Sequence, residues 1–164
     1  MKLHIFLLTS LIITSCNQRE SLFQKSYSGQ TQGTFFSIIY FCPENRDFSN
    51  AIDSIFNAID FSVSLYNQKS NLILLNQKKR ISYDPIIDTL TKQSIRVNKL
   101  TNENFSCALY PLINYFGFYS KKRPVSVDTL NIFRLLSSSK MSNIKIDKDY
   151  IYLDSSTSLD FNAI

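Results

Sequence analysis

Thr34-Phe35-Phe36-Ser37-Ile38-Ile39-Tyr40-Phe41-Cys42 is the stretch that decides the fold class of this chain. Its residues are aromatic, β-branched or otherwise apolar on both alternating faces, which predicts a β-strand that is covered on two sides. Pro43-Glu44-Asn45 ends this strand. The helices and strands predicted on either side of it then determine which type of layered fold contains this strand.

Apolar residues recur at helical spacing after the strand. Ser49 or Asn50 is expected to cap a first helix. Its apolar positions are Ile52, Ile55, Phe56, Ile59 and Val63. Asp84 followed by Pro85 predicts the start of a second helix, because aspartate caps well and proline suits the first helical position. The apolar side of this helix runs through Ile86, Ile87, Leu90, Ser94 and Val97.

Two more elements are predicted further along the chain. Asp128 is expected to cap a shorter helix. The apolar residues of this helix are Leu130, Phe133, Leu135 and Leu136. Residues 144–146 and 151–153 alternate in polarity around Asp147-Lys148-Asp149, which predicts a β-hairpin. The order strand, helix, helix, short helix, hairpin predicts an α+β fold.

The N-terminal residues have the pattern of an export signal. Lys2 is positive and residues 5–13 are apolar, a run far shorter than the roughly 20 residues that cross a bilayer as a helix. Ile13-Thr14-Ser15-Cys16 follows and resembles the lipobox of bacterial lipoproteins, which implies a lipid on Cys16. An ordinary cleaved signal is the alternative. We therefore expect a signal peptide over residues 1–15, a polar tether over 16–27 and one domain over 28–164, anchored to a bacterial cell membrane and facing the periplasm or the cell exterior.

The amino-acid composition limits which partners and which catalytic groups this chain can use. The net charge is +5, but charges of both signs are interspersed and export argues against nucleic acid as a partner. The one histidine, His4, lies in the signal, so a Ser-His or Cys-His pair is excluded from the mature chain. Catalysis would have to rest on carboxylates, hydroxyls, backbone groups and a metal held by oxygen. Cys42 and Cys107 leave one disulfide open as an alternative to two free thiols.

Four separated segments carry a family pattern. They are Gly29-Gln30-Thr31-Gln32-Gly33-Thr34, Ser64-Leu65-Tyr66-Asn67-Gln68-Lys69-Ser70 with Asn76 beyond it, Pro111-Leu112-Ile113-Asn114-Tyr115-Phe116-Gly117-Phe118, and Leu159-Asp160-Phe161-Asn162-Ala163-Ile164. In order and spacing they resemble the ApbE family, the FAD:protein FMN transferases. The resemblance implies an ApbE-like mixed sheet with packed helices, of which this chain would hold the N-terminal half.

The resemblance also implies a reaction. The FMN part of FAD would be transferred, with magnesium, to a Thr or Ser hydroxyl of an exported acceptor protein, and AMP would leave. FAD is then a substrate and Mg²⁺ the cofactor. This chemistry needs positioning and charge neutralisation more than covalent work by the protein, and magnesium prefers oxygen ligands.

The resemblance assigns roles to four residues. Gln32 stands at a flavin-contacting methionine, Tyr66 matches a tyrosine that packs against FAD, and Asp160 matches an acidic residue that contacts FAD. The backbone carbonyl of Ala163 matches a magnesium ligand. Plainer alternatives stay open: a turn residue for Gln32, a core tyrosine at a helix end for Tyr66, and a turn or cap carboxylate for Asp160.

Departures from the family pattern define the alternatives. Asn104, Phe105 and Ser106 align with a motif that holds the nucleotide, Gly-Ala-Phe-Asp-x-Thr, but Ser106 replaces its carboxylate and Ala108 its hydroxyl. The family's Lys-Gly-Tyr continuation and later metal ligands would follow Ile164, whose apolar surroundings predict that the sequence continues. No catalytic residue is assigned, and we expect these residues alone not to catalyse transfer. The alternative functions are a lipid-anchored flavin-binding protein or an inactive fragment.

Overall fold

The computed structural model describes residues 21–119, 124 and 126–164. It divides into two compact units, Met1–Asn50 and Ala51–Ile164, which are described separately. The predicted signal peptide and Cys16 lie outside the described residues. Among the residues that are described, no helix is long and apolar enough to cross a membrane.

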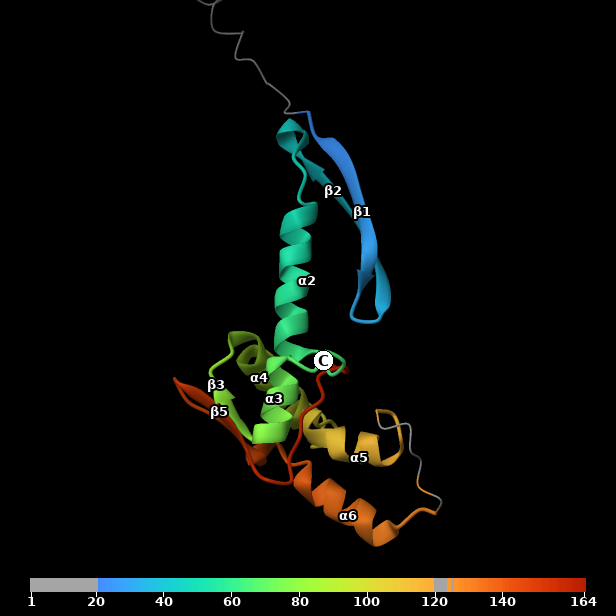
Figure 1. The fold of residues 1–164 in the computed structure, drawn as a ribbon, viewed down its shortest axis with the longest axis vertical. Coiled ribbons are helices and arrows are strands. Elements are labelled where there is room, and N and C mark those ends of the chain that lie inside the picture. The colour runs from blue at the N-terminus through green and yellow to red at the C-terminus, as the bar shows by residue number, and fades with distance from the viewer. Residues whose placement is uncertain (1–20, 120–123, 125) are drawn as a thin grey trace, which may run out of the picture. The chain divides into compact units, whose positions relative to one another are not determined.

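The N-terminal unit is an antiparallel β-hairpin (Figure 1). Strands β1 (Phe23–Thr31) and β2 (Thr34–Cys42) pair along their whole length. Gln32 and Gly33 form the connecting turn, both with positive φ angles, 51° and 76°, as a two-residue hairpin turn requires. The predicted strand is confirmed. The predicted tether is wrong from Phe23 onward, because the polar residues of β1 pair with the apolar β2.

The two faces of this hairpin differ in exposure. Phe36 and Ile38 lie on one face and are half-buried, with the ring of Phe36 edge-on to Tyr27 at 5.4 Å. On the opposite face, Phe35, Ile39 and Phe41 are exposed. The prediction that both faces of β2 are covered is therefore wrong for the unit as described, where only one face is packed.

The C-terminal unit holds the helices and a small sheet (Figure 1). The helices are α2 (Ser49–Val63), which begins at the boundary of the units, α3 (Asn71–Lys78), α4 (Pro85–Leu100), α5 (Tyr110–Tyr115) and α6 (Thr129–Ser138). This unit also holds the 3-10 turns η2 (Cys107–Leu109) and η3 (Met141–Asn143), whereas η1 (Pro43–Asn45) belongs to the N-terminal unit. The strands β3 (Arg80–Ser82), β4 (Ile144–Ile146) and β5 (Tyr150–Leu153) form an antiparallel sheet in the order β3-β5-β4. The predicted helices and hairpin are confirmed, as is the α+β class.

The helix starts follow the predicted capping with one exception. Asp84 caps α4 and Asp128 caps α6, as expected. Ser49 lies inside α2 instead of capping it, and the Asp47 carboxylate accepts the Ser49 N–H at 2.9 Å. Ser49 and Asn50 both lie inside α2, so the prediction of either one as the cap is wrong, and the Asp47 carboxylate accepts the N–H of the first helical residue instead.

Besides strand β1, the elements α3, β3 and α5 were not predicted. Helix α3 carries Leu72, Ile73, Leu74 and Leu75 as one continuous apolar run, which has no helical period to recognise. Ser70 caps it by accepting the N–H of Ile73. Residues from α3, α4, β5 and the C-terminal segment meet in the core with no exposed surface. These are Leu72, Leu75, Ile87, Ile151 and Leu159.

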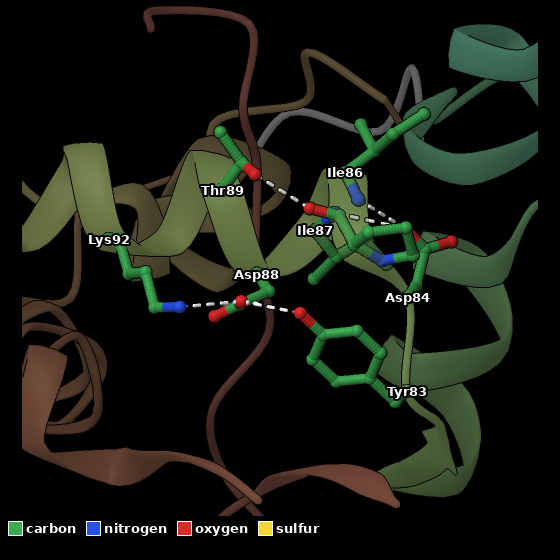
Figure 2. A network of polar contacts seen from close by, with 8 residues as sticks. Tyr83, Asp84, Ile86, Ile87, Asp88, Thr89 and Lys92 are labelled. Atoms are coloured by element: carbon green, nitrogen blue, oxygen red, sulfur yellow. Dashed lines mark hydrogen bonds and ion pairs between the residues drawn. The ribbon is translucent and has the colours of Figure 1, made fainter. Parts of the chain in front are cut away.

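Asp84 joins three helices of the C-terminal unit. Its Oδ1 accepts the backbone N–H groups of Ile86 at 2.9 Å and Ile87 at 3.0 Å, which caps α4 (Figure 2). Its Oδ2 accepts the Ser62 hydroxyl of α2 and the Asn71 amide of α3, both at 2.8 Å. The side chain is only 4% exposed, so these four donors take the place of water around the carboxylate.

A second acidic group stands one turn further along α4. The Asp88 Oδ2 accepts hydrogen bonds from Lys92 Nζ and from the Tyr83 hydroxyl, each at 2.7 Å (Figure 2). The bond from Lys92 and then that from Tyr83 lower the pKa of Asp88 below its ordinary value. Asp88 raises the pKa of Lys92 in return.

Replacing Asp88 with asparagine is expected to make the fold less sensitive to acid. Because the folded-state pKa of Asp88 lies below the ordinary 3.8, its ionised form stabilises the fold above that pH, and the contribution is lost as the pH falls through the folded-state pKa. The variant lacks this contribution throughout and should lose less than about 1 kcal/mol at neutral pH. Urea unfolding across the acid range measures the difference. Parallel acid profiles for the two proteins would contradict the expectation.

Candidate functional site

The site lies on the C-terminal segment, residues 157–162, of which residues 157–161 are buried although they form neither a helix nor a strand. Asn76 on α3 fixes this segment: its side-chain amide donates to the Leu159 carbonyl at 2.9 Å, and its side-chain oxygen accepts the Leu159 N–H at 2.7 Å. Lys79 Nζ donates to the Thr157 carbonyl at 2.6 Å and to the Ser158 hydroxyl at 2.9 Å. Burial lowers the pKa of Lys79. Hydrogen bonds from the side chains of Asn76 and Lys79 therefore satisfy backbone groups that a neighbouring strand would otherwise pair with.

Asp160 is the acidic group of this segment and is 8% exposed. Its backbone N–H donates to the Cys107 carbonyl at 2.7 Å. Its Oδ1 accepts the N–H of Asn162 at 2.8 Å, and its Oδ2 accepts the hydroxyl of Tyr119 at 2.5 Å. In the described part of the chain the ion pairs are Arg46–Glu44 and Lys92–Asp88. The Asp160 carboxylate is therefore held by neutral donors, with no cation paired to it there.

Tyr119 links this carboxylate to two further tyrosine rings. The ring of Tyr119 stacks on Tyr110, with centroids 5.0 Å apart, and meets Tyr66 edge-on at 6.3 Å. Burial, followed by the hydrogen bond to Asp160 and its charge, raises the pKa of Tyr119, so its hydroxyl stays a donor at neutral pH. The ring of Tyr66 is 73% exposed. An exposed aromatic face beside a carboxylate suits a planar ring system that carries hydrogen-bond donors.

Residues 106–108, before α5, contact the site segment through the backbone bond between Cys107 and Asp160. The hydroxyl of Ser106 donates to the Ser139 carbonyl at 2.6 Å and accepts the Ala108 N–H at 3.1 Å. Burial raises the pKa of Cys107 to about 11, so its thiol stays protonated and is a poor nucleophile. Cys42 and Cys107 are both buried free thiols.

The structure brings two predicted site residues, Tyr66 and Asp160, together through Tyr119. Ala163 lies exposed in a turn two residues after Phe161. Gln32 is in the hairpin turn of the N-terminal unit. Two of the three plainer alternatives agree with the structure, because Gln32 occupies a turn and the Asp160 carboxylate accepts the N–H of Asn162 at a turn. The third does not, because Tyr66 is too exposed to be a core residue.

The remaining predicted positions lie in the loop between α4 and η2. Asn104 is exposed and its amide donates to the Thr101 carbonyl at 2.9 Å. Phe105 is half-buried, and its carbonyl accepts the Asn98 amide. Ser106 follows as described above, with its hydroxyl bound to backbone.

Tyr119 and Asn162 were not predicted as site residues. Asn162 donates through its amide to the Tyr119 hydroxyl at 2.9 Å. Tyr119 directly follows the third family-like segment, and Asn162 lies inside the fourth. Their positions next to those segments were the signal that could have found them, but only the fold brings residues 119 and 160 into contact.

Magnesium needs several oxygen ligands, often with substrate phosphates and water completing the shell. No group of three or more His, Cys, Asp or Glu side chains that could hold a metal occurs within residues 21–119, 124 and 126–164. Of the residues predicted to contact FAD or magnesium, Asp160 offers a carboxylate and Ala163 a backbone carbonyl. These two do not by themselves make up a magnesium site.

Comparisons with known proteins agree on one family. The model of the ApbE family matches residues 32–164. A curated relative, the FAD:protein FMN transferase of Vibrio cholerae serotype O1, is 29% identical over 170 aligned positions, which cover 93% of this chain and 50% of the relative. The chain thus spans about half the length of that relative.

Solved structures give the same fold. The apo form of Pseudomonas stutzeri flavinyl transferase ApbE matches with a TM-score of 0.77 at 17% identity, over 86% of this chain and 48% of that one. Flavin transferase ApbE from Vibrio cholerae matches with a TM-score of 0.74 at 24% identity, over 86% and 48%. Fold and family model agree with the segments that carried the resemblance in the sequence. The chain belongs to the ApbE family.

Proposed function

We propose that this chain binds FAD at the site formed by Tyr66, Tyr119 and Asp160, and that it serves transfer of the FMN part of FAD to a Thr or Ser hydroxyl of an exported protein. The observation that carries the proposal is the meeting of Tyr66 and Asp160 at one side chain, Tyr119. The names of the curated relatives, FAD:protein FMN transferases, support the same reaction.

The site suits a flavin nucleotide for two physical reasons. The exposed face of Tyr66 can stack on a planar ring, a contact worth about 1–3 kcal/mol. The carboxylate of Asp160 keeps free lone pairs, because Tyr119 and Asn162 each fill one of about four acceptor positions. An N–H or O–H group of the nucleotide can donate to these positions.

In the proposed reaction the acceptor hydroxyl oxygen forms a bond to the FMN phosphorus. The bond from that phosphorus to the pyrophosphate bridging oxygen breaks, AMP leaves, and the hydroxyl proton passes to solvent. Magnesium would neutralise charge on the phosphates. The described residues contribute binding and orientation, since Cys107 is a buried protonated thiol and no histidine occurs among them.

The test uses the protein purified after expression from its own gene. FAD is titrated and followed by flavin fluorescence, and AMP is then quantified with Mg²⁺ or with EDTA. We expect saturable FAD binding and AMP release that requires Mg²⁺. Absence of FAD binding would sink the proposal, and AMP release that survives EDTA would remove magnesium from it.

A second candidate is a flavin-binding protein without transfer activity. It is favoured by Ser106 and Ala108, because the Ser106 hydroxyl is committed to the Ser139 carbonyl and Ala108 has no hydroxyl. Saturable FAD binding with no AMP release under any metal condition would support this candidate over the first.

We also propose that a lipid on Cys16 anchors the chain to a bacterial cell membrane, facing the periplasm or the cell exterior. The lipobox-like sequence before Cys16 supports this, because attached acyl chains hold a protein at a membrane. Replacing Cys16 with alanine should move the protein out of the membrane fraction of its host. A variant that stays in that fraction would contradict the anchor.

A further inference from the structure

We propose that Tyr119 is a positioning residue, which orients the Asp160 carboxylate and the Tyr66 ring for the flavin nucleotide. The inference rests on the proposed function and adds a residue and a role to it. Tyr119 makes a ring contact to Tyr66 and a hydrogen bond to Asp160, so it links the two side chains.

The hydroxyl of Tyr119 fixes the carboxylate by a two-sided contact. It donates to Asp160 Oδ2 at 2.5 Å and accepts the Asn162 amide at 2.9 Å. Because it accepts from Asn162, its proton is directed toward Asp160. With Oδ1 bound to the Asn162 N–H at 2.8 Å, each carboxylate oxygen has one neutral donor and a defined set of free lone pairs. The direction in which Asp160 can accept from a ligand is thereby set.

The ring of Tyr119 has a second role, which is to pack against the neighbouring tyrosine rings. It is stacked on Tyr110, with an angle of 17° between the ring planes, and it meets Tyr66 at 61°. Since Tyr66 is largely exposed, its packing on the protein side depends on such edge contacts. The stack therefore fixes Tyr119, and Tyr119 supports the Tyr66 ring from one side.

The contact also joins distant parts of the chain. Tyr119 lies in the turn after α5, whereas Asp160 and Asn162 lie in the irregular C-terminal segment, 41 and 43 positions away. No strand ladder orients this segment at Asp160. A side chain from another element must therefore fix the carboxylate, and Tyr119 supplies that bond.

The test separates orientation of Asp160 from simple packing. Tyr119→Phe removes the hydroxyl and keeps the stacked ring. Tyr110→Phe is the matched control: it removes a hydroxyl from the other ring of the stack, one that makes no hydrogen bond to Asp160 within the described residues. FAD affinity is measured by flavin fluorescence with Mg²⁺ present, and thermal unfolding is recorded for every variant.

We expect Tyr119→Phe to weaken FAD binding about tenfold, because a hydrogen bond to a charged group is lost. Tyr110→Phe should stay within about twofold of wild type. In an Asp160→Asn background the extra loss from Tyr119→Phe should shrink to less than about twofold, because the residue that Tyr119 positions has already been changed.

Each other outcome has a definite meaning. Wild-type FAD affinity in Tyr119→Phe overturns the inference while the proposed function stands. A full additional tenfold loss in the Asp160→Asn background also overturns it, since Tyr119 would then act independently of Asp160. A wild-type protein that does not bind FAD removes the proposed function and the positioning role with it.

Discussion

Replacing Asp84 with alanine is expected to lower the free energy of unfolding of the C-terminal unit by about 3 kcal/mol, the largest stability loss that we expect from one side chain. The loss of the cap on α4 accounts for about 1 kcal/mol of this. The Ser62 hydroxyl and the Asn71 amide also lose their shared acceptor, and buried donors left without a partner are costly. Urea unfolding at neutral pH, followed by far-UV circular dichroism, measures the change.

Asp128 provides the matched control for this prediction. It caps α6 through one hydrogen bond, to the N–H of Asn131 at 3.2 Å, and is exposed. Asp128→Ala should therefore cost only about 1 kcal/mol. Asp84→Asn should lie between the two, because the amide retains one acceptor for the α4 N–H groups. Equal losses for Asp84→Ala and Asp128→Ala would show that the bonds to α2 and α3 contribute nothing.

Replacing Tyr66 with alanine is expected to weaken FAD binding about tenfold or more, since stacking of a planar ring on an aromatic side chain is worth about 1–3 kcal/mol. The same change should alter the free energy of unfolding by no more than about 0.5 kcal/mol, because the side chain is 73% exposed. We therefore expect this substitution to change the affinity for FAD without changing the stability of the fold. Fluorescence titration with FAD and urea unfolding of the same samples provide the two measurements.

Tyr66→Phe is the control for the stacking argument. It keeps the ring that would face the flavin and should bind FAD within about twofold of wild type. If Tyr66→Ala retained wild-type affinity, the flavin would not lie on this ring. If it unfolded the protein, Tyr66 would instead have the structural role that its position after α2 first suggested.

The fold could be predicted where a local rule decides the structure. The aromatic and β-branched residues of β2, the Asp84-Pro85 start of α4 and the residues flanking Asp147 are all local signals, and each led to the observed element. Strand β1 is polar and looked like a tether, because its pairing with β2 depends on residues that lie across the hairpin turn. Helix α3 was hidden in a continuous apolar run that has no period.

The candidate site was only partly visible in the sequence. Resemblance pointed to Tyr66 and Asp160, which the fold brings together at Tyr119. The only local signal for Tyr119 is its position directly after the third family-like segment, because its contact to Asp160 spans 41 positions. The same reason hid the role of Asn76, whose amide fixes the backbone of Leu159.

The bond between Asn76 and Leu159 also has a consequence for the time course of folding. It joins residues 83 positions apart, and contacts between distant positions form late because a long loop must first close. Leu72, Leu75 and Ile87 leave the ribosome well before Leu159, which packs with them in the core. Until Leu159 has been synthesised these side chains lack one of their partners and are exposed to chaperones or to self-association. Asp160 follows Leu159 directly, so its contact with Tyr119 forms in the same late step that brings Leu159 into the core.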